Sequence, residues 1–325
     1  MIRTTLRRFA AFIAAASVAT AMAQGYPTRT ITLIVPFSAG GPTDTIARVI
    51  AERMGRSLNQ TIVVENVAGA GGTIANNRLM KSEADGYTFA VGHLGTHVIA
   101  PAVQQLKVDY VNDLEPIAMV ASNPQVIVSR TTVPAKDLKE FIAWIKANPG
   151  KVSTGTGGPG TPAHISGVYF SDTIGTPVTI IHYKGAAPAM QDVIAGHIDM
   201  NFDQAATALA HARGGRVRAY AVTQKTRLKS APEIPTTDEA GLPGFYMTIW
   251  HAFWVPKGTP KDVVAKLNGA IRDALADEAV KKRLEGMGQE IPPPEQQTPE
   301  ALRAHHKAET DKWWPVIKAA GIKAQ

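Results

Sequence analysis

The stretch "IVPFSAGGPTDTIAR", residues 34–48, joins an apolar strand to an amphipathic helix through a pair of glycines. Gly40 and Gly41 allow the backbone to turn sharply, and the proline after them suits the first turn of a helix. The N–H groups at this turn then lie at the positive end of the helix dipole, which favours an anion. The alternative is a tight turn in which Thr43 and Asp44 only cap the helix. The pattern supports both interpretations equally.

A second stretch, "STGTGGPGTPAHIS" at residues 153–166, repeats the order of strand, glycine loop, threonine, proline and helix. Ligands of open α/β sheets bind beyond the carboxyl ends of the strands, where both loops are expected. Two such loops that face each other can each hold one end of a doubly charged ligand. Farther along, Lys184-Gly185 also precedes a predicted helix, and Asp203 ends a strand directed to the same edge.

The second loop also matches G-x-G-x-x-G at Gly155, Gly157 and Gly160. This motif indicates a dinucleotide site when an acidic residue follows the next strand, and the strand "VTIIHYKG" ends without one. Neither glycine loop contains the G-K-[ST] of a phosphate-binding P-loop. We therefore expect no nucleotide and no other cofactor.

Short β-branched runs alternate with amphipathic helices along the chain, which predicts an α/β fold with mostly parallel sheets. Two blocks of this kind meet near Asn123-Pro124, which predicts two lobes at 24–122 and 123–220 and a return to the first lobe, with C-terminal helices, at 221–325. The predicted helices lie at 42–55, 138–150, 162–175, 187–196, 261–286 and 299–321, and two separate strands are predicted at 115–121 and 125–130.

The N-terminal stretch has the three parts of a secretory signal. Residues 1–24, "MIRTTLRRFAAFIAAASVATAMAQ", contain three arginines, an apolar run and then Ala21-Met22-Ala23. This predicts a signal peptide at 1–23, cleaved after Ala23. The chain has no cysteine, which excludes disulfides, thiolate chemistry and a lipid anchor at the cleavage point. We expect an unanchored periplasmic protein.

The charge balance favours small anions rather than nucleic acid. The formal net charge is +7, and removal of the three signal-peptide arginines leaves +4. No run of five or six basic residues occurs, so a nucleic-acid partner is not expected. A mild positive field is sufficient to attract a small acid.

Metal and catalytic sites are not expected either. His93 and His97 are four residues apart, but "GHLGTHVIAP" at 92–101 contains a glycine and is predicted as a loop, with no carboxylate at ligand spacing. The chain has no cysteine nucleophile and no G-x-S-x-G elbow. We therefore assign no catalytic residue.

The motifs together resemble a known family. "VPFSAGGPTDTIAR", "ENVAGAGGTIA", "NPGKVSTGTGGPGTPAHIS", "IHYKGAAPAMQDVIAGHIDMNFD" and "APEIPTTDEAGLPG" follow the order expected of the Bug/TctC receptors, the extracytoplasmic solute-binding proteins of tripartite tricarboxylate transporters. The resemblance covers essentially the whole chain after the signal. It implies a type II-like periplasmic binding fold, in which two α/β lobes close at a hinge on a ligand held in the cleft between them.

The resemblance also implies where the ligand binds. Family carboxylates lie between the two glycine loops, on backbone N–H groups, small hydroxyls and water. We expect Arg48 to pair with Asp44 across one helical turn rather than to bind the ligand. The candidate ligand-binding residues are Phe37, Ser38, Ala39, Gly40, Gly41, Thr43, Asp44, His97, Thr154, Thr156, Gly158, Gly160, Thr161, His164 and Asp203.

The function that follows is a monomeric periplasmic receptor. It would bind a small organic acid, such as a di- or tricarboxylate or an aromatic carboxylate, and deliver it to the membrane subunits of a tripartite tricarboxylate transporter. Two alternatives stay open: an exported α/β enzyme that acts on an organic acid, and a receptor that passes its signal to a sensor kinase.

Overall fold

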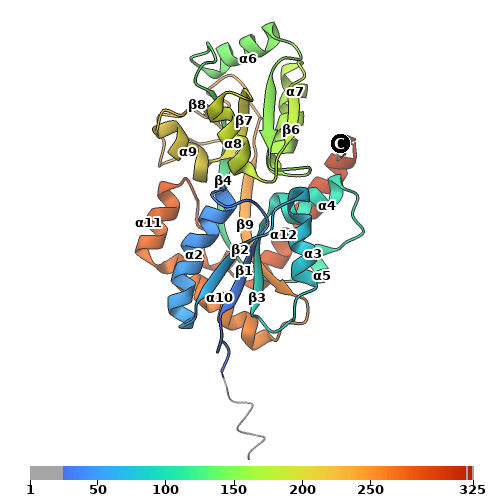
Figure 1. Ribbon diagram of the computed structural model, residues 1–325, viewed down its shortest axis with the longest axis vertical. Coiled ribbons are helices and arrows are strands. Elements are labelled where there is room, and N and C mark those ends of the chain that lie inside the picture. The colour runs from blue at the N-terminus through green and yellow to red at the C-terminus, as the bar shows by residue number, and fades with distance from the viewer. Residues whose placement is uncertain (1–24, 320, 324–325) are drawn as a thin grey trace, which may run out of the picture.

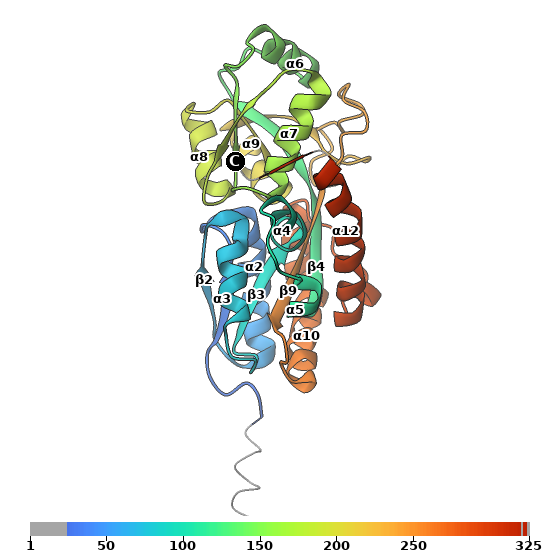
Figure 2. The same cartoon turned by 90° about the vertical axis from the view of Figure 1, so that its right-hand side faces the viewer.

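The computed structural model describes residues 25–319 and 321–323, so the predicted signal peptide lies outside the described residues. Within them the chain forms two α/β lobes, one above the other in Figure 1, and the same division is visible after a quarter turn in Figure 2. Two long strands lie where the chain passes between the lobes, and one of them pairs with strands of both lobes.

The lower lobe contains both ends of the described chain. Its strands are β1 (Ile31–Val35), β2 (Ile62–Asn66), β3 (Thr88–His93), β9 (Thr248–Pro256) and the first part of β4 (Leu114–Arg130). Its helices are α2 (Pro42–Leu58), α3 (Thr73–Met80), α4 (Ala100–Val103), α5 (Tyr110–Asp113), α10 (Lys261–Ala276), α11 (Glu278–Gly286) and α12 (Pro299–Ala319). The strand order is β2-β1-β3-β9-β4. One face is buried under α2, α10 and α11, and the other under α3 and α12.

The upper lobe repeats this layered plan. Its strands are β5 (Ser153–Thr156), β6 (Thr179–His182), β7 (Met200–Gln204), β8 (Val217–Val222) and the second part of β4. Its helices are α6 (Leu138–Ala147), α7 (Pro162–Ile174), α8 (Ala186–Ala195) and α9 (Ala205–Arg213). One face of the sheet is covered by α6 and α7, which contribute Phe141 and Phe170 to the core, and the other by α8 and α9, which contribute Met190 and Leu209.

The strand β4 crosses from one lobe to the other. It replaces the two separate strands predicted from the sequence. The segment 114–124 pairs with β9, whereas 125–130 pairs with β7 and β8. Pro124, which has no N–H to donate, lies where the partners change. The lobe boundaries at 122/123 and 220/221 stay predictions.

The prediction of mostly parallel sheets is wrong at the centre of the molecule. β1 is parallel to β2 and β3, and β5 is parallel to β6 and β7. By contrast, β4 and β9 run antiparallel to each of their neighbours. The reason is connectivity: β4 carries the chain from the lower lobe into the upper one, and β9 brings it back after the upper lobe is complete, so the two strands run in opposite directions.

Three local predictions also need correction. The helix predicted over 261–286 is divided at Asp277, whose side chain caps α11 by accepting the N–H groups of Ala279 and Val280. The loop predicted over 92–101 is instead a π-helical turn, Gly95–Ile99, followed by α4. This turn is fully buried, so its backbone groups must be hydrogen-bonded internally. The helix α9 was not predicted.

Candidate functional site

A cavity lies between the two lobes where β1, β5 and β7 end. The empty space at this cavity, with the solvent at its open side included, amounts to about 390 Å³. The lining residues come from both lobes and from both crossing strands. They are Phe37, Pro42, Thr43, His93, Gln125, Gly157, Thr161, Pro162, Ala163, Ala186, Phe202, Asp203, Gln204 and Ile249.

Four helices begin at this cavity. Its lining includes the first residues of α2, α7 and α8, which are Pro42, Pro162 and Ala186, and Gln204 immediately before α9. Within the described chain, no side chain caps any of these four N-termini. Each N-terminus bears a partial positive charge and free N–H donors. Since no lysine or arginine is among the described lining residues, the helix ends supply the positive potential.

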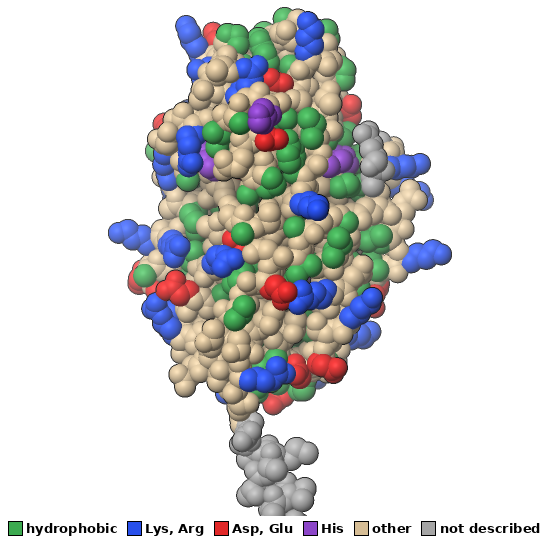
Figure 3. Space-filling model, viewed as in Figure 1, with side chains coloured by type: hydrophobic (Ala, Val, Ile, Leu, Met, Phe, Trp, Pro, Cys, Tyr) green, Lys and Arg blue, Asp and Glu red, His purple; other side chains and the backbone are tan. Residues whose placement is uncertain are grey.

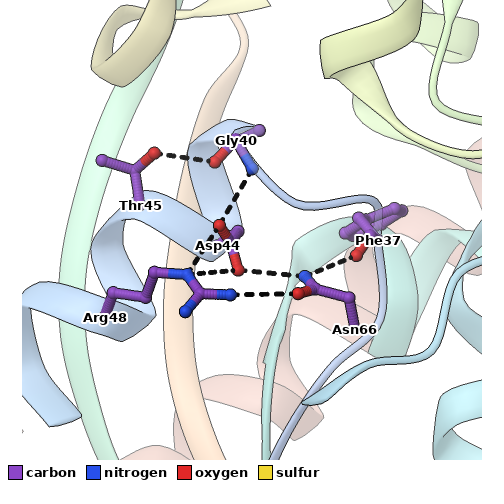
Figure 4. Close-up of polar contacts among 7 residues, drawn as sticks. Phe37, Gly40, Asp44, Thr45, Arg48 and Asn66 are labelled. Atoms are coloured by element: carbon purple, nitrogen blue, oxygen red, sulfur yellow. Dashed lines mark hydrogen bonds and ion pairs between the residues drawn. The ribbon is translucent and has the colours of Figure 1, made fainter. Parts of the chain in front are cut away.

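Asp44 holds the first glycine loop in shape. Figure 4 shows its carboxylate accepting hydrogen bonds from the Gly40 N–H at 2.9 Å, from Asn66 Nδ2 at 2.9 Å and from Arg48 Nε at 2.9 and 3.0 Å. Asn66 Nδ2 also donates to the Phe37 carbonyl at 2.9 Å. Burial opposes ionisation, but these bonds outweigh it and hold the pKa of Asp44 below its usual value. The predicted pairing of Arg48 with Asp44 is confirmed.

Two of the N–H groups expected to face an anion donate to protein oxygens instead. Gly40 N–H donates to Asp44, and Ser38 N–H donates to the Lys184 carbonyl of the other lobe at 3.3 Å. Ser38 Oγ is buried without a hydrogen-bond partner. Pro42 also lines the cavity but has no N–H, so the backbone donors that the first turn of α2 offers there begin with the N–H of Thr43, another lining residue.

The second glycine loop is held by its own side chains. Thr156 Oγ1 lies 2.7 Å from His182 Nδ1 and accepts the Gly158 N–H at 3.2 Å. His164 Nδ1 accepts the Gly160 N–H at 3.1 Å, so this nitrogen carries no proton and the ring is neutral. Burial, with the neighbouring His182, lowers the pKa of His164 to about 4, in agreement with that role. Gly157 and the residues that begin α7 then face the cavity.

A neutral histidine forms part of the lower wall. His93 stacks on Phe37 with ring centroids 5.1 Å apart, and its Nδ1 accepts the Gly95 N–H at 2.8 Å. Burial lowers the pKa of His93 to about 3. Next to it, His251 Nε2 lies 3.4 Å from Thr43 Oγ1, and burial also lowers the pKa of His251. These rings are uncharged at neutral pH.

Asp203 is the one carboxyl group among the described lining residues. It is 1% exposed. Its Oδ2 accepts a hydrogen bond from Thr207 Oγ1 at 2.5 Å, whereas its Oδ1 has no partner in the described structure. Burial raises the pKa of Asp203 to about 7.

The structure brings only some of the predicted residues to the cavity. Phe37, Thr43, Thr161 and Asp203 line it. His97 does not: it is stacked on Trp254 at 3.7 Å within the lower core, and Thr96 Oγ1 lies 2.8 Å from its Nδ1. The other predicted residues belong to the two loops but not to the lining. They are Ser38, Ala39, Gly40, Gly41, Asp44, Thr154, Thr156, Gly158, Gly160 and His164.

Sequence reasoning missed the contribution of the crossing strands. Gln125 on β4 and Ile249 on β9 line the cavity. Gln125 Oε1 accepts from Ser166 Oγ of α7 at 2.5 Å, and its Nε2 donates to the Phe202 carbonyl at 3.1 Å. The available signal was a polar residue between Pro124 and the apolar run of residues 126–128. Ala186 was not predicted to line the site either, although Lys184-Gly185 directly before it was predicted to precede a helix.

Three general features accompany the site. Within the described ranges, no group of three or more His, Cys, Asp or Glu side chains is arranged to hold a metal. None of the described helices has the length and apolar character needed to cross a bilayer. On the face shown in Figure 3, Lys and Arg side chains are scattered among acidic ones rather than gathered into a basic patch.

Known proteins resemble this chain in both sequence and fold. Residues 46–322 match the family model described as the tripartite tricarboxylate transporter family receptor, TctC. The solved periplasmic binding protein BugD is 38% identical, with a TM-score of 0.88 over 92% of this chain and 100% of BugD. MatC of Rhodopseudomonas palustris, solved with malate, is 37% identical, with a TM-score of 0.86 over 90% of this chain and 100% of MatC.

A third structure, Rpa4515 of R. palustris with adipate, is 31% identical, with a TM-score of 0.86 over 92% of this chain and 99% of that protein. The predicted periplasmic binding fold is confirmed by these matches. They cover nearly the full length of each relative, and the matching family is one of receptors rather than enzymes. The chain therefore belongs to the TctC, or Bug, family of solute-binding receptors of tripartite tricarboxylate transporters.

Proposed function

We propose that this protein is a periplasmic receptor that binds a small organic carboxylate in the interlobe cavity and delivers it to the membrane subunits of a tripartite tricarboxylate transporter. The supporting observation is the convergence of four uncapped helix N-termini on a cavity whose described lining contains no lysine or arginine. Each helix end favours an anion by about 0.3–1 kcal/mol. Together they make an anionic ligand the best-matched class.

The relatives support a dicarboxylate within that class. MatC was solved with malate and Rpa4515 with adipate, and both share this fold. We infer that one carboxylate of the ligand lies near Thr43 and the start of α2. The rest of the ligand would extend toward Thr161 and Asp203 in the upper lobe. Phe37, stacked on His93, would pack against its carbon chain.

The route to the periplasm belongs to the same proposal. We infer cleavage after Ala23, which would release an unanchored protein that begins at Gln24. N-terminal sequencing of the protein from a periplasmic extract should read Gln24 first. A protein that retains residues 1–23 would contradict this part of the proposal.

The ligand class is tested by thermal shift on the mature protein against malate, adipate, other organic acids and nucleotides. An acid at about 100 times its Kd stabilises the folded state by about 2.7 kcal/mol, which raises the melting temperature measurably. Thr43→Val should reduce this shift because Thr43 lines the cavity. Thr61→Val, at an exposed position before β2, should leave it unchanged.

Two results would contradict the proposal. In one, every acid fails and a nucleotide stabilises the protein. In the other, a stabilising acid is consumed during the incubation, which would indicate the enzyme alternative instead.

A further inference from the structure

The state of Asp203 deepens the proposed function, on which this inference rests. Asp203 lies at the end of β7, directly before α9, and it is almost completely buried. Thr207 Oγ1 donates to Oδ2 at 2.5 Å, so that oxygen is already an acceptor. Oδ1 has no hydrogen-bond partner among the described residues and belongs to a side chain that lines the cavity. A buried polar atom without a hydrogen-bond partner costs free energy, so a group on the ligand is expected to hydrogen-bond to Oδ1.

The described residues that line the cavity around Asp203 carry no counter-charge for an ionised carboxylate. The lining residues from the neighbouring elements are Gln125 of β4, Gln204 before α9, Thr43 of α2, His93 of β3, Ile249 of β9, Pro162 and Ala163 of α7 and Ala186 of α8. The only other titratable group among them is His93, which burial keeps neutral with a pKa of about 3. Behind the lining, burial also lowers the pKa values of His164 and His251.

We propose that Asp203 receives the ligand as a neutral carboxylic acid, whose Oδ1–H donates a hydrogen bond to a carboxylate oxygen of the bound acid. Where Asp203 is ionised in the empty protein, a proton from solvent forms the Oδ1–H bond and no other covalent bond changes, so binding then takes up a proton. Two ionised carboxylates would repel each other in this buried position, whereas a carboxyl–carboxylate pair forms a strong charge-assisted hydrogen bond.

The sign of the pH dependence follows from burial. The pKa of Asp203 is raised to about 7 in the empty protein. A bound anion raises it further, because like charge disfavours ionisation. Above this pKa, each pH unit should weaken carboxylate binding by up to about tenfold, and below it the affinity should become constant.

The same arrangement selects against one ligand class. An amino acid whose ammonium group approached Oδ1 would require the ionised form of Asp203. Its binding would release a proton and would strengthen as the pH rises. The direction of proton exchange therefore separates a plain dicarboxylate from a ligand with a cationic end.

The first experiment needs no ligand. The mature protein, labelled with carbon-13 at the aspartate carboxyl, is titrated by NMR and compared with D203N. We expect a resonance that is absent from D203N to titrate with a midpoint of about 7. A midpoint of about 4, the usual value for aspartate, would overturn the proposal.

The second experiment measures proton exchange by calorimetry with malate and adipate, in buffers of different ionisation enthalpy, between about pH 6 and pH 8. We expect uptake of up to about one proton per acid at the upper end of this range. D203N retains a donor in the form of its amide, so it should bind with an affinity that does not change with pH. D172N, an exposed position on α7, should behave like the wild type.

Proton release, or exchange that persists in D203N, would overturn the proposal. If no acid of the panel binds, the proposed function fails instead. The carbon-13 midpoint still determines whether Asp203 is neutral in that case, so the two failures are distinguishable.

Discussion

At the scale of single residues, the two acidic side chains at the site have opposite roles. Asp44 is ionised and tied to Gly40, Arg48 and Asn66, so its charge is used to fix the loop. Asp203 has only neutral donors, the Thr207 hydroxyl and the Gln204 backbone N–H, and no cation among the described lining residues. The difference arises from their partners, because both side chains are buried.

The role of Asp44 predicts a pH-dependent effect of its replacement. Asp44→Asn removes the charge that Arg48 and Gly40 bind, and we expect a loss of about 2 kcal/mol in the free energy of unfolding at pH 7. Because the pKa of Asp44 is lowered in the folded state, its contribution is complete above the unfolded pKa, about 3.9, and disappears as pH falls through the folded pKa.

Urea denaturation of wild type and D44N at several pH values measures this difference. Asp85→Asn, which removes a surface ion pair with Arg29, is the matched control and should change stability by less than about 1 kcal/mol. An equal effect of the two substitutions would argue against a special role for the Asp44 network.

At the scale of elements, the crossing strand β4 positions the upper wall of the site. Gln125 on β4 accepts from Ser166 of α7 and donates to the Phe202 carbonyl of β7. One buried amide therefore joins α7, β4 and β7 where the cavity begins. This explains why a glutamine is tolerated at a buried position of this strand.

Removal of the Ser166 hydroxyl tests this connection. Ser166→Ala leaves Gln125 Oε1 buried without its donor, and we expect a loss of about 1–3 kcal/mol in the free energy of unfolding. Thr173→Ala, on the exposed side of the same helix, removes only a bond to the Tyr169 carbonyl and should change stability by about 0.5 kcal/mol or less. Chemical denaturation of both variants checks the contrast, and similar losses would contradict it.

At the scale of the whole molecule, the lobes meet through close backbone contacts. Pro159 O accepts from Gln104 Nε2 at 3.2 Å, and Lys184 O accepts from Ser38 N–H at 3.3 Å. Gly160, with φ +78°, approaches α4 so closely that a Cβ would lie 2.4 Å from Ala100 Cα. A contact of backbone with backbone leaves no flexible side chain to move aside, so this arrangement of the lobes requires glycine there.

Gly160→Ala should therefore prevent the lobes from closing to this distance. We expect ligand affinity to fall by more than about tenfold, because the binding-competent population decreases. Small-angle X-ray scattering in the presence of ligand should show a larger radius of gyration for G160A than for the wild type. Gly175→Ala introduces the same kind of strain at φ +65° with no atom within 4 Å, so it should reduce stability but not affinity. Unchanged affinity in G160A would show that closure does not depend on this contact.

The sequence by itself determined most of the elements and the class of the protein. The strand–glycine–proline–helix order fixed the starts of α2 and α7, since these residue types restrict the backbone locally. The spacing of Asp44 and Arg48 on one helix face likewise predicted their pairing.

Only the tertiary structure decided which side chains line the cavity. Gln125, Ile249 and Ala186 lie far apart in sequence, and His97, although close to His93, turns into the core against Trp254. Local sequence restricts backbone angles over a few residues, whereas the lining of a cavity depends on how distant elements pack, and that packing is set by the whole chain at once.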